Sequence, residues 1–214
     1  SIYGASEAAG GFAVNDIVTL IFAVPMLILS MLLAAKGRWV GFLCWPGMLF
    51  YLGYNYIPYV FDAAFGVMQL PYLLVVSLSI STIILLAAGI NSSVLAQSMH
   101  SSVPVKSAAV ILLLLGIFVI LYQAGDILGT FIEGSKDTEA STALIFADFV
   151  LAGPSLLAGG VLLLRKKPIG YYIGPIMLFA YGTLSTGVLI LFILNALLGH
   201  ASLDAASFIT ILTM

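Results

Sequence analysis

The stretch PMLILSMLLAAKGRWVGFLCWPGMLFYLG, residues 25–53, decides the fold, because two long apolar runs flank a short basic turn. The turn is Lys36-Gly37-Arg38, and the apolar runs continue outward from it to about Ile17 and Phe61. An α-helix needs about 20 apolar residues to cross the hydrocarbon core of a bilayer. The stretch therefore predicts a helical hairpin, in which two antiparallel membrane-spanning helices are joined by a tight turn.

The same design recurs 129 residues later, where residues 154–182, PSLLAGGVLLLRKKPIGYYIGPIMLFAYG, align with the first stretch without a gap. Two pairs of prolines and two pairs of glycines stay in register: Pro25 with Pro154, Pro46 with Pro175, Gly41 with Gly170, and Gly53 with Gly182. The alignment predicts a parallel internal repeat of two helical hairpins, about 15–61 and 142–198. An axis near the membrane normal would relate them, as in some transporter folds.

The composition places the chain in a membrane. Hydrophobic residues make up 62% of it and charged residues 7%, with a mean hydropathy of +1.20. In soluble domains about a quarter of the residues are charged, so this chain cannot cover a water-facing surface. A net charge of −2 without a basic patch gives no nucleic-acid signal, so we expect no nucleic acid as a partner. The single cysteine, Cys44, excludes an internal disulfide and is expected to be a small apolar core residue.

Six apolar stretches are long enough to span a bilayer. They lie at about 17–35, 40–61, 71–90, 108–132, 142–164 and 169–198. The tail at 201–214 is too short to cross again, and we expect it to lie at the membrane interface. The predicted fold is an all-α polytopic bundle that forms one transmembrane domain over residues 1–214.

Basic residues predict how the bundle is oriented. Six of the seven fall in three connections that this topology places on one side: Lys36, Arg38, Lys106, Arg165, Lys166 and Lys167. Only Lys136 falls on the other side. Because cytoplasmic loops carry the excess of lysine and arginine, these three connections are expected in the cytoplasm and both visible termini outside the cell membrane.

Several acids gather near the outer side of the predicted bundle. Asp148, in IFADFVLAGP (145–154), lies about 24 Å along its helix from Leu164, inside the apolar core. Asp126 also has apolar helix on both sides. An ionisable residue inside a membrane is by default a functional hypothesis, here a shared proton or a bound cation. The alternative for this pair is a hydrogen-bonded structural plug, and Asp16 and Asp62 have simpler explanations as a helix cap and an interfacial residue.

Two functional hypotheses follow, neither of them catalytic. In the first, an outward-open cavity between the hairpins is lined by Asp16, Asp126, Asp148, Asn55 and Tyr54 and binds or transports a proton, a cation or a small polar solute. In the second, the chain is an accessory subunit that packs against other membrane subunits or copies of itself. No H-E-x-x-H, G-x-S-x-G or Walker A motif occurs, so we expect neither cofactor nor metal, and an enzyme is the less favoured class.

The residues that define the hairpins also carry a resemblance. The segments NDIVTLIFAVPMLILSMLLAAKGRWVGFLCWPGMLFYLGYNYIPYVFDAAF, QAGDILGTFIEG and IFADFVLAGPSLLAGGVLLLRKKPIGYYIGPIMLF resemble a family of uncharacterised prokaryotic polytopic membrane proteins. The likeness covers about Asn15 to Phe192 and implies acids at Asp16, Asp126 and Asp148. It also implies a further apolar helix upstream of Ser1. It implies no activity.

Overall fold

The computed structural model describes residues 9–63, 66–99, 104–133 and 142–197, and helices cover each of the six predicted apolar stretches. Their bounds are α1 Ala9–Val18, η1 Thr19–Ala23, α2 Val24–Ala35, α3 Trp39–Phe61, α4 Gln69–Gly89, α5 Ser92–Met99, α6 Val105–Glu133, α7 Thr142–Ala147, η2 Asp148–Ala152, α8 Gly153–Leu164 and α9 Gly170–Leu197. The short helix α5, in the serine-rich connection, was not predicted. The all-α prediction is confirmed for the described residues.

In the part of the chain that the structure describes, five helices are long and apolar enough to cross a membrane, which indicates a multi-pass membrane protein. They are Gly11–Ala35, Gln69–Gly89, Val105–Ile132, Thr142–Leu164 and Gly170–Leu197. The remaining long helix, α3, has 23 residues, but tyrosine, asparagine, glycine and proline residues interrupt its apolar sequence. Large apolar side chains such as Leu78 and Leu85 of α4 and Leu114 and Leu121 of α6 are exposed, as expected for surfaces that face lipid.

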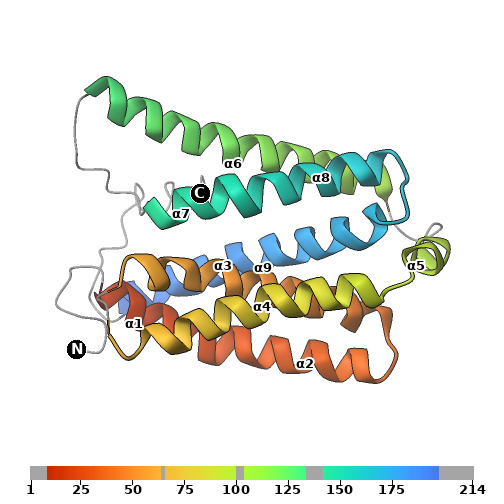
Figure 1. Cartoon of the computed structure of the whole chain (residues 1–214), viewed down its shortest axis with the longest axis horizontal. Coiled ribbons are helices and arrows are strands. Elements are labelled where there is room, and N and C mark those ends of the chain that lie inside the picture. Colours follow the sequence, from red (N-terminus) through yellow and green to blue (C-terminus); the bar gives the residue numbers. More distant parts are fainter. Residues whose placement is uncertain (1–8, 64–65, 100–103, 134–141, 198–214) are drawn as a thin grey trace.

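The helices form three layers. Figure 1 shows α6 and α8 on one side, α3 and α9 in the middle, and α2 and α4 on the other side. Glycines let the helices approach closely, because Gly47 of α3 lies against Ile176 and Phe179 of α9, and Gly160 of α8 lies against Leu113 of α6.

Two of the predicted spans contain a π-helical turn a short distance before a proline. The segment η1 ends two residues before Pro25, and η2 ends two residues before Pro154. Proline lacks an N–H group and its ring crowds the preceding turn, so the helix widens there instead of continuing regularly. In both spans the irregular turn lies before the proline and not at it.

The two basic turns have the same backbone geometry. In the first turn Gly37 has φ 70°, and in the second Lys166 has φ 51°. After each turn a glycine lies against the end of the previous helix. A Cβ atom on Gly41 would lie 2.1 Å from the Ala34 nitrogen, and one on Gly170 would lie 2.5 Å from the Leu162 carbonyl carbon. Any larger residue would push the two helices of either hairpin apart.

Parts of the sequence prediction lie outside the described residues. These are the region before Ala9, the segment with Lys136, and the tail at 201–214.

Candidate functional site

Asp148 is buried where three parts of the bundle meet. It is the first residue of the π-helical segment η2, and its side chain is 7% exposed. Tyr54 approaches it from α3 and Gln123 from α6. A residue that begins a π-helical turn sits on a local widening of its helix, and such turns are frequent at functional sites.

Both carboxylate oxygens of Asp148 accept a hydrogen bond. The Tyr54 hydroxyl donates to Oδ1 over 2.7 Å, and Nε2 of Gln123 donates to Oδ2 over 2.5 Å. Hydrogen bonds to an ionised group are stronger than those between neutral groups. The three residues lie far apart along the chain, so this contact fastens α3, α6 and η2 to one another.

Two polar atoms beside this contact have no hydrogen-bond partner among the described residues. They are Oε1 of Gln123, whose side chain is 5% exposed, and the hydroxyl of Tyr181 on α9. Tyr181 lies close enough to both Asp148 and Tyr54 to interact with them electrostatically. Buried polar groups are nearly always paired, so these two atoms leave hydrogen-bonding capacity unfilled in the surroundings of the Asp148 carboxylate.

The described hydrogen bonds join two of the predicted site residues and place a third in another cluster. Tyr54 and Asp148 are in contact, whereas Asp16 lies in a second polar cluster near the start of the chain, where it accepts a hydrogen bond from Tyr56 over 2.9 Å. Asn55 interacts with Tyr51.

Asp126 lies one turn beyond Gln123 on α6 and is partly buried. Within the ranges that the structure describes, no hydrogen bond joins its carboxylate to Asp148. The described hydrogen bonds therefore place Gln123 in contact with Asp148.

The second polar cluster is built around Tyr59, which is 1% exposed. Its hydroxyl donates to the Phe12 carbonyl over 2.7 Å and accepts from Nδ2 of Asn15 over 3.0 Å. The rings of Tyr56 and Tyr72 lie 4.8 and 5.0 Å from that of Tyr59. Here the aromatic residues of α3 hold α1 in place, which is a structural role.

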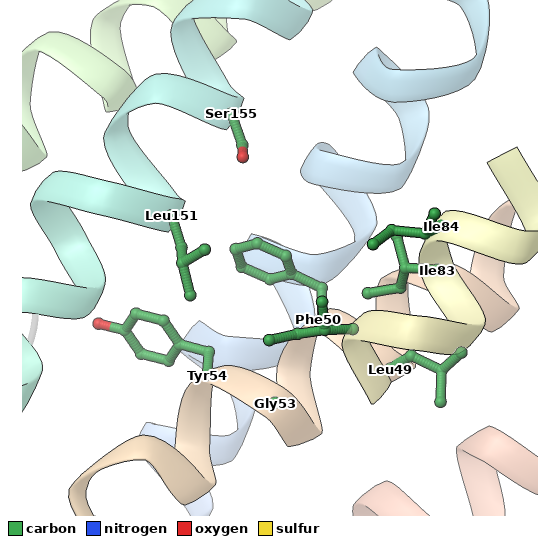
Figure 2. Close-up of a pocket in the computed structure, with 9 residues that line it drawn as sticks. Leu49, Phe50, Gly53, Tyr54, Ile83, Ile84, Leu151 and Ser155 are labelled. Atoms are coloured by element: carbon green, nitrogen blue, oxygen red, sulfur yellow. The ribbon is translucent and has the colours of Figure 1, made fainter. Parts of the chain in front are cut away.

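A cavity of about 170 Å³ lies between α3, α4 and the η2–α8 segment. Figure 2 shows its lining: Leu49, Phe50, Gly53, Tyr54, Ile80, Ile83, Ile84, Leu151 and Ser155. The walls are apolar apart from the hydroxyls of Tyr54 and Ser155. Of the five residues expected around an acidic cavity, only Tyr54 lines this one.

Residue patterns anticipated part of this site. Asp148 was identified as an acid inside an apolar helix, whereas Gln123 was not among the predicted site residues. Tyr181 was missed, since nothing in the repeat marks it: the matching residue in the first hairpin is Leu52. Among the described residues, no group of three histidine, cysteine or acidic side chains is placed to hold a metal ion.

No family model, curated protein or solved structure matches the chain. The family resemblance drawn from the hairpin segments therefore stays a prediction, and the geometry around Asp148 carries the functional argument.

Proposed function

We propose that this membrane protein binds a proton, a cation or a small polar solute at Asp148 and that this site serves its transport. The observation that carries the proposal is the pair of unpartnered polar atoms, Gln123 Oε1 and the Tyr181 hydroxyl, beside a buried carboxylate. A carboxylate, an amide oxygen and a phenol are oxygen ligands of the kind that hard cations and hydronium accept.

The charge balance around Asp148 supports this proposal. The described basic residues lie at the far end of the bundle, in the two turns and at the start of α6, and the second turn begins about 24 Å along the helix from Asp148. An ionised carboxylate in the apolar core is costly unless it is neutralised. Tyr54 and Gln123 donate hydrogen bonds to it but bring no positive charge. A proton or a bound cation would supply the missing compensation.

The Gln123 amide suits both charge states of Asp148. Its NH₂ group faces Oδ2 of Asp148 and can donate to the ionised carboxylate. A rotation of the amide by 180° would present Oε1 to a protonated carboxyl, which would then donate to it. The same contact can therefore hold Asp148 with and without a proton, which a site that exchanges protons requires.

We also propose that α3 is a sixth span and that the two hairpins arose by duplication. Helix α3 is about 34 Å long at 1.5 Å per residue, and it connects to spanning helices at both ends. The elements η1 and α2 match η2 and α8 at every boundary when shifted by 129 residues. With the basic turns in the cytoplasm, Asp148 would face the outer half of the membrane.

Reconstitution into lipid vesicles tests the functional proposal. Wild type is compared with Asp148→Asn for proton flux, read with a pH-sensitive dye inside the vesicle, and for Na⁺ and K⁺ flux. The asparagine keeps the size of the side chain and an oxygen for Tyr54 but cannot ionise. We expect a folded variant without flux. A variant that folds and keeps its flux contradicts the proposal, and one that fails to fold supports the structural plug.

A further inference from the structure

A second cavity, of about 520 Å³, lies at the end of the bundle that carries the basic turns. It is formed by the start of α6 and by the turn between α8 and α9, which lie at the same end of the molecule in Figure 1. Its lining residues are Pro104, Val105, Lys106, Ser107, Val110, Leu164, Lys166 and Tyr171. The volume lies within the range of cavities that hold small molecules.

The lining of this cavity is amphipathic. Lys106 and Lys166 bring positive charge from two separate segments, and no carboxylate is among the lining residues. Ser107 and Tyr171 add hydroxyl groups, while Val110 and Leu164 belong to helices that continue into the apolar part of the bundle. A ligand that fits would carry a negative charge at one end and hydrocarbon at the other.

The backbone at Lys166 is a further sign that its side chain has a use. Its φ of 51° lies in the left-handed region, which residues with a side chain adopt rarely. The first hairpin has Gly37 at the matching position, with φ 70°, where glycine is free of strain. The second turn therefore holds a lysine where glycine would fit better, and the strain is tolerated at the mouth of a cavity.

We propose that this cavity binds the phosphate group of an anionic phospholipid, with Lys106 and Lys166 on either side of the phosphate. Lysine ammonium groups bind phosphate as point charges and can donate hydrogen bonds to its oxygens. Basic pockets between transmembrane helices at the cytoplasmic face are suited to anionic lipid headgroups. The apolar wall at Val110 and Leu164 favours a lipid over a free anion, because it offers surface to the acyl chain.

Thermal denaturation in mild detergent, with and without added lipid, tests this site. Ligands that bind the folded state raise the midpoint by an amount that depends on their affinity. Phosphatidylglycerol is titrated against wild type, Lys166→Gly, Lys106→Gln and the control Lys36→Gln, with phosphatidylcholine as the zwitterionic comparison. Lys36 lies in the other basic turn and does not line this cavity.

We expect phosphatidylglycerol to raise the midpoint of wild type and of Lys36→Gln equally. Lys166→Gly and Lys106→Gln should each bind it about fivefold more weakly, which corresponds to the loss of one lysine near a membrane surface. Without lipid, Lys166→Gly should melt at the same temperature as wild type or higher, because glycine relieves the left-handed backbone.

Three results would overturn the proposal. If Lys36→Gln weakens the binding of phosphatidylglycerol as much as the two cavity variants do, the lipid binds to the general positive charge at this end of the bundle and not to the cavity. An unchanged affinity in both cavity variants would show that the lysines do not bind the phosphate. Stabilisation by inorganic phosphate to the same extent as by phosphatidylglycerol would identify a free anion as the ligand.

Discussion

Thr19 and Asp148 lie at the same point of two matching helices: each begins a five-residue π-helical turn and precedes a proline by six residues. Both side chains are buried, with 5% and 7% exposed. The backbone arrangement is thus repeated, whereas the charge is present only once. If the hairpins descend from one unit, a single carboxylate distinguishes their two widened turns, and the functional proposal depends on that difference.

Removing the Asp148 carboxylate should destabilise the protein in proportion to the hydrogen bonds that are lost. Asp148→Ala leaves the Tyr54 hydroxyl and the Gln123 amide buried without their acceptor, and each such group costs about 1–3 kcal/mol. Asp148→Asn should cost less, because the asparagine oxygen can accept from Tyr54 and its NH₂ group can donate to a rotated Gln123 amide. Thermal denaturation in detergent measures both variants.

Thr19→Ala is the matched control, since Thr19 holds the equivalent position without a carboxylate. We expect it to lower the midpoint less than Asp148→Ala does. If Thr19→Ala, Asp148→Ala and Asp148→Asn lower the midpoint equally, the geometry of the π-helical turn determines stability and the hydrogen bonds to Asp148 contribute little.

Gly41→Ala and Gly170→Ala should destabilise the two hairpins similarly. At both positions a Cβ atom would lie within about 2.5 Å of the backbone of the preceding helix, so the helices must separate. Overpacking of this kind costs about 1–3 kcal/mol. Circular dichroism during heating measures the loss of stability. Gly125→Ala provides a control, because a Cβ atom on Gly125 would have no neighbour within 4 Å. A large loss at one turn and none at the other would contradict the proposed duplication.

The helices could be predicted closely because apolar length and basic turns determine them locally. The second predicted span, 40–61, differs from α3 by one residue at its start, and the fifth, 142–164, matches α7, η2 and α8 together. The first apolar stretch was predicted to begin at about Ile17, with a helix cap as one explanation for Asp16, whereas α1 begins at Ala9. Asn15 and Asp16 instead bind tyrosines of α3, so they are accommodated inside a continuing helix.

The site could be predicted only in part, because it depends on contacts between distant helices. The position of each residue along its helix identified Asp148, but it also grouped Asp148 with Asp16 and Asn55, whose described partners are Tyr56 and Tyr51. The rotation of each helix about its axis decides which residues meet. That rotation is set by close packing at glycines such as Gly47 and Gly153, and a nearly uniform apolar pattern gives little sign of it.

Cysteine accessibility can establish whether α3 crosses the membrane. In a Cys44→Ala background, single cysteines replace Lys36, Asp62 and Lys167, and a membrane-impermeant maleimide is applied to intact cells. If α3 is a span, position 62 should react from outside, and positions 36 and 167 should react only after the cells are lysed. Labelling of position 62 together with position 36 would contradict both the sixth span and the predicted orientation.

The polar cluster around Tyr59 should affect stability but not transport. Tyr59→Phe removes the donor to the Phe12 carbonyl and the acceptor for Asn15, so we expect a loss of about 1–3 kcal/mol in detergent. Asp16→Asn keeps an oxygen that can accept from Tyr56, and we expect it to fold like wild type. In the vesicle assay Asp16→Asn should retain full flux, in contrast to Asp148→Asn. If Asp16→Asn also abolished flux while remaining folded, the two polar clusters would belong to one pathway, and the separation between them in this structure would have to close during transport.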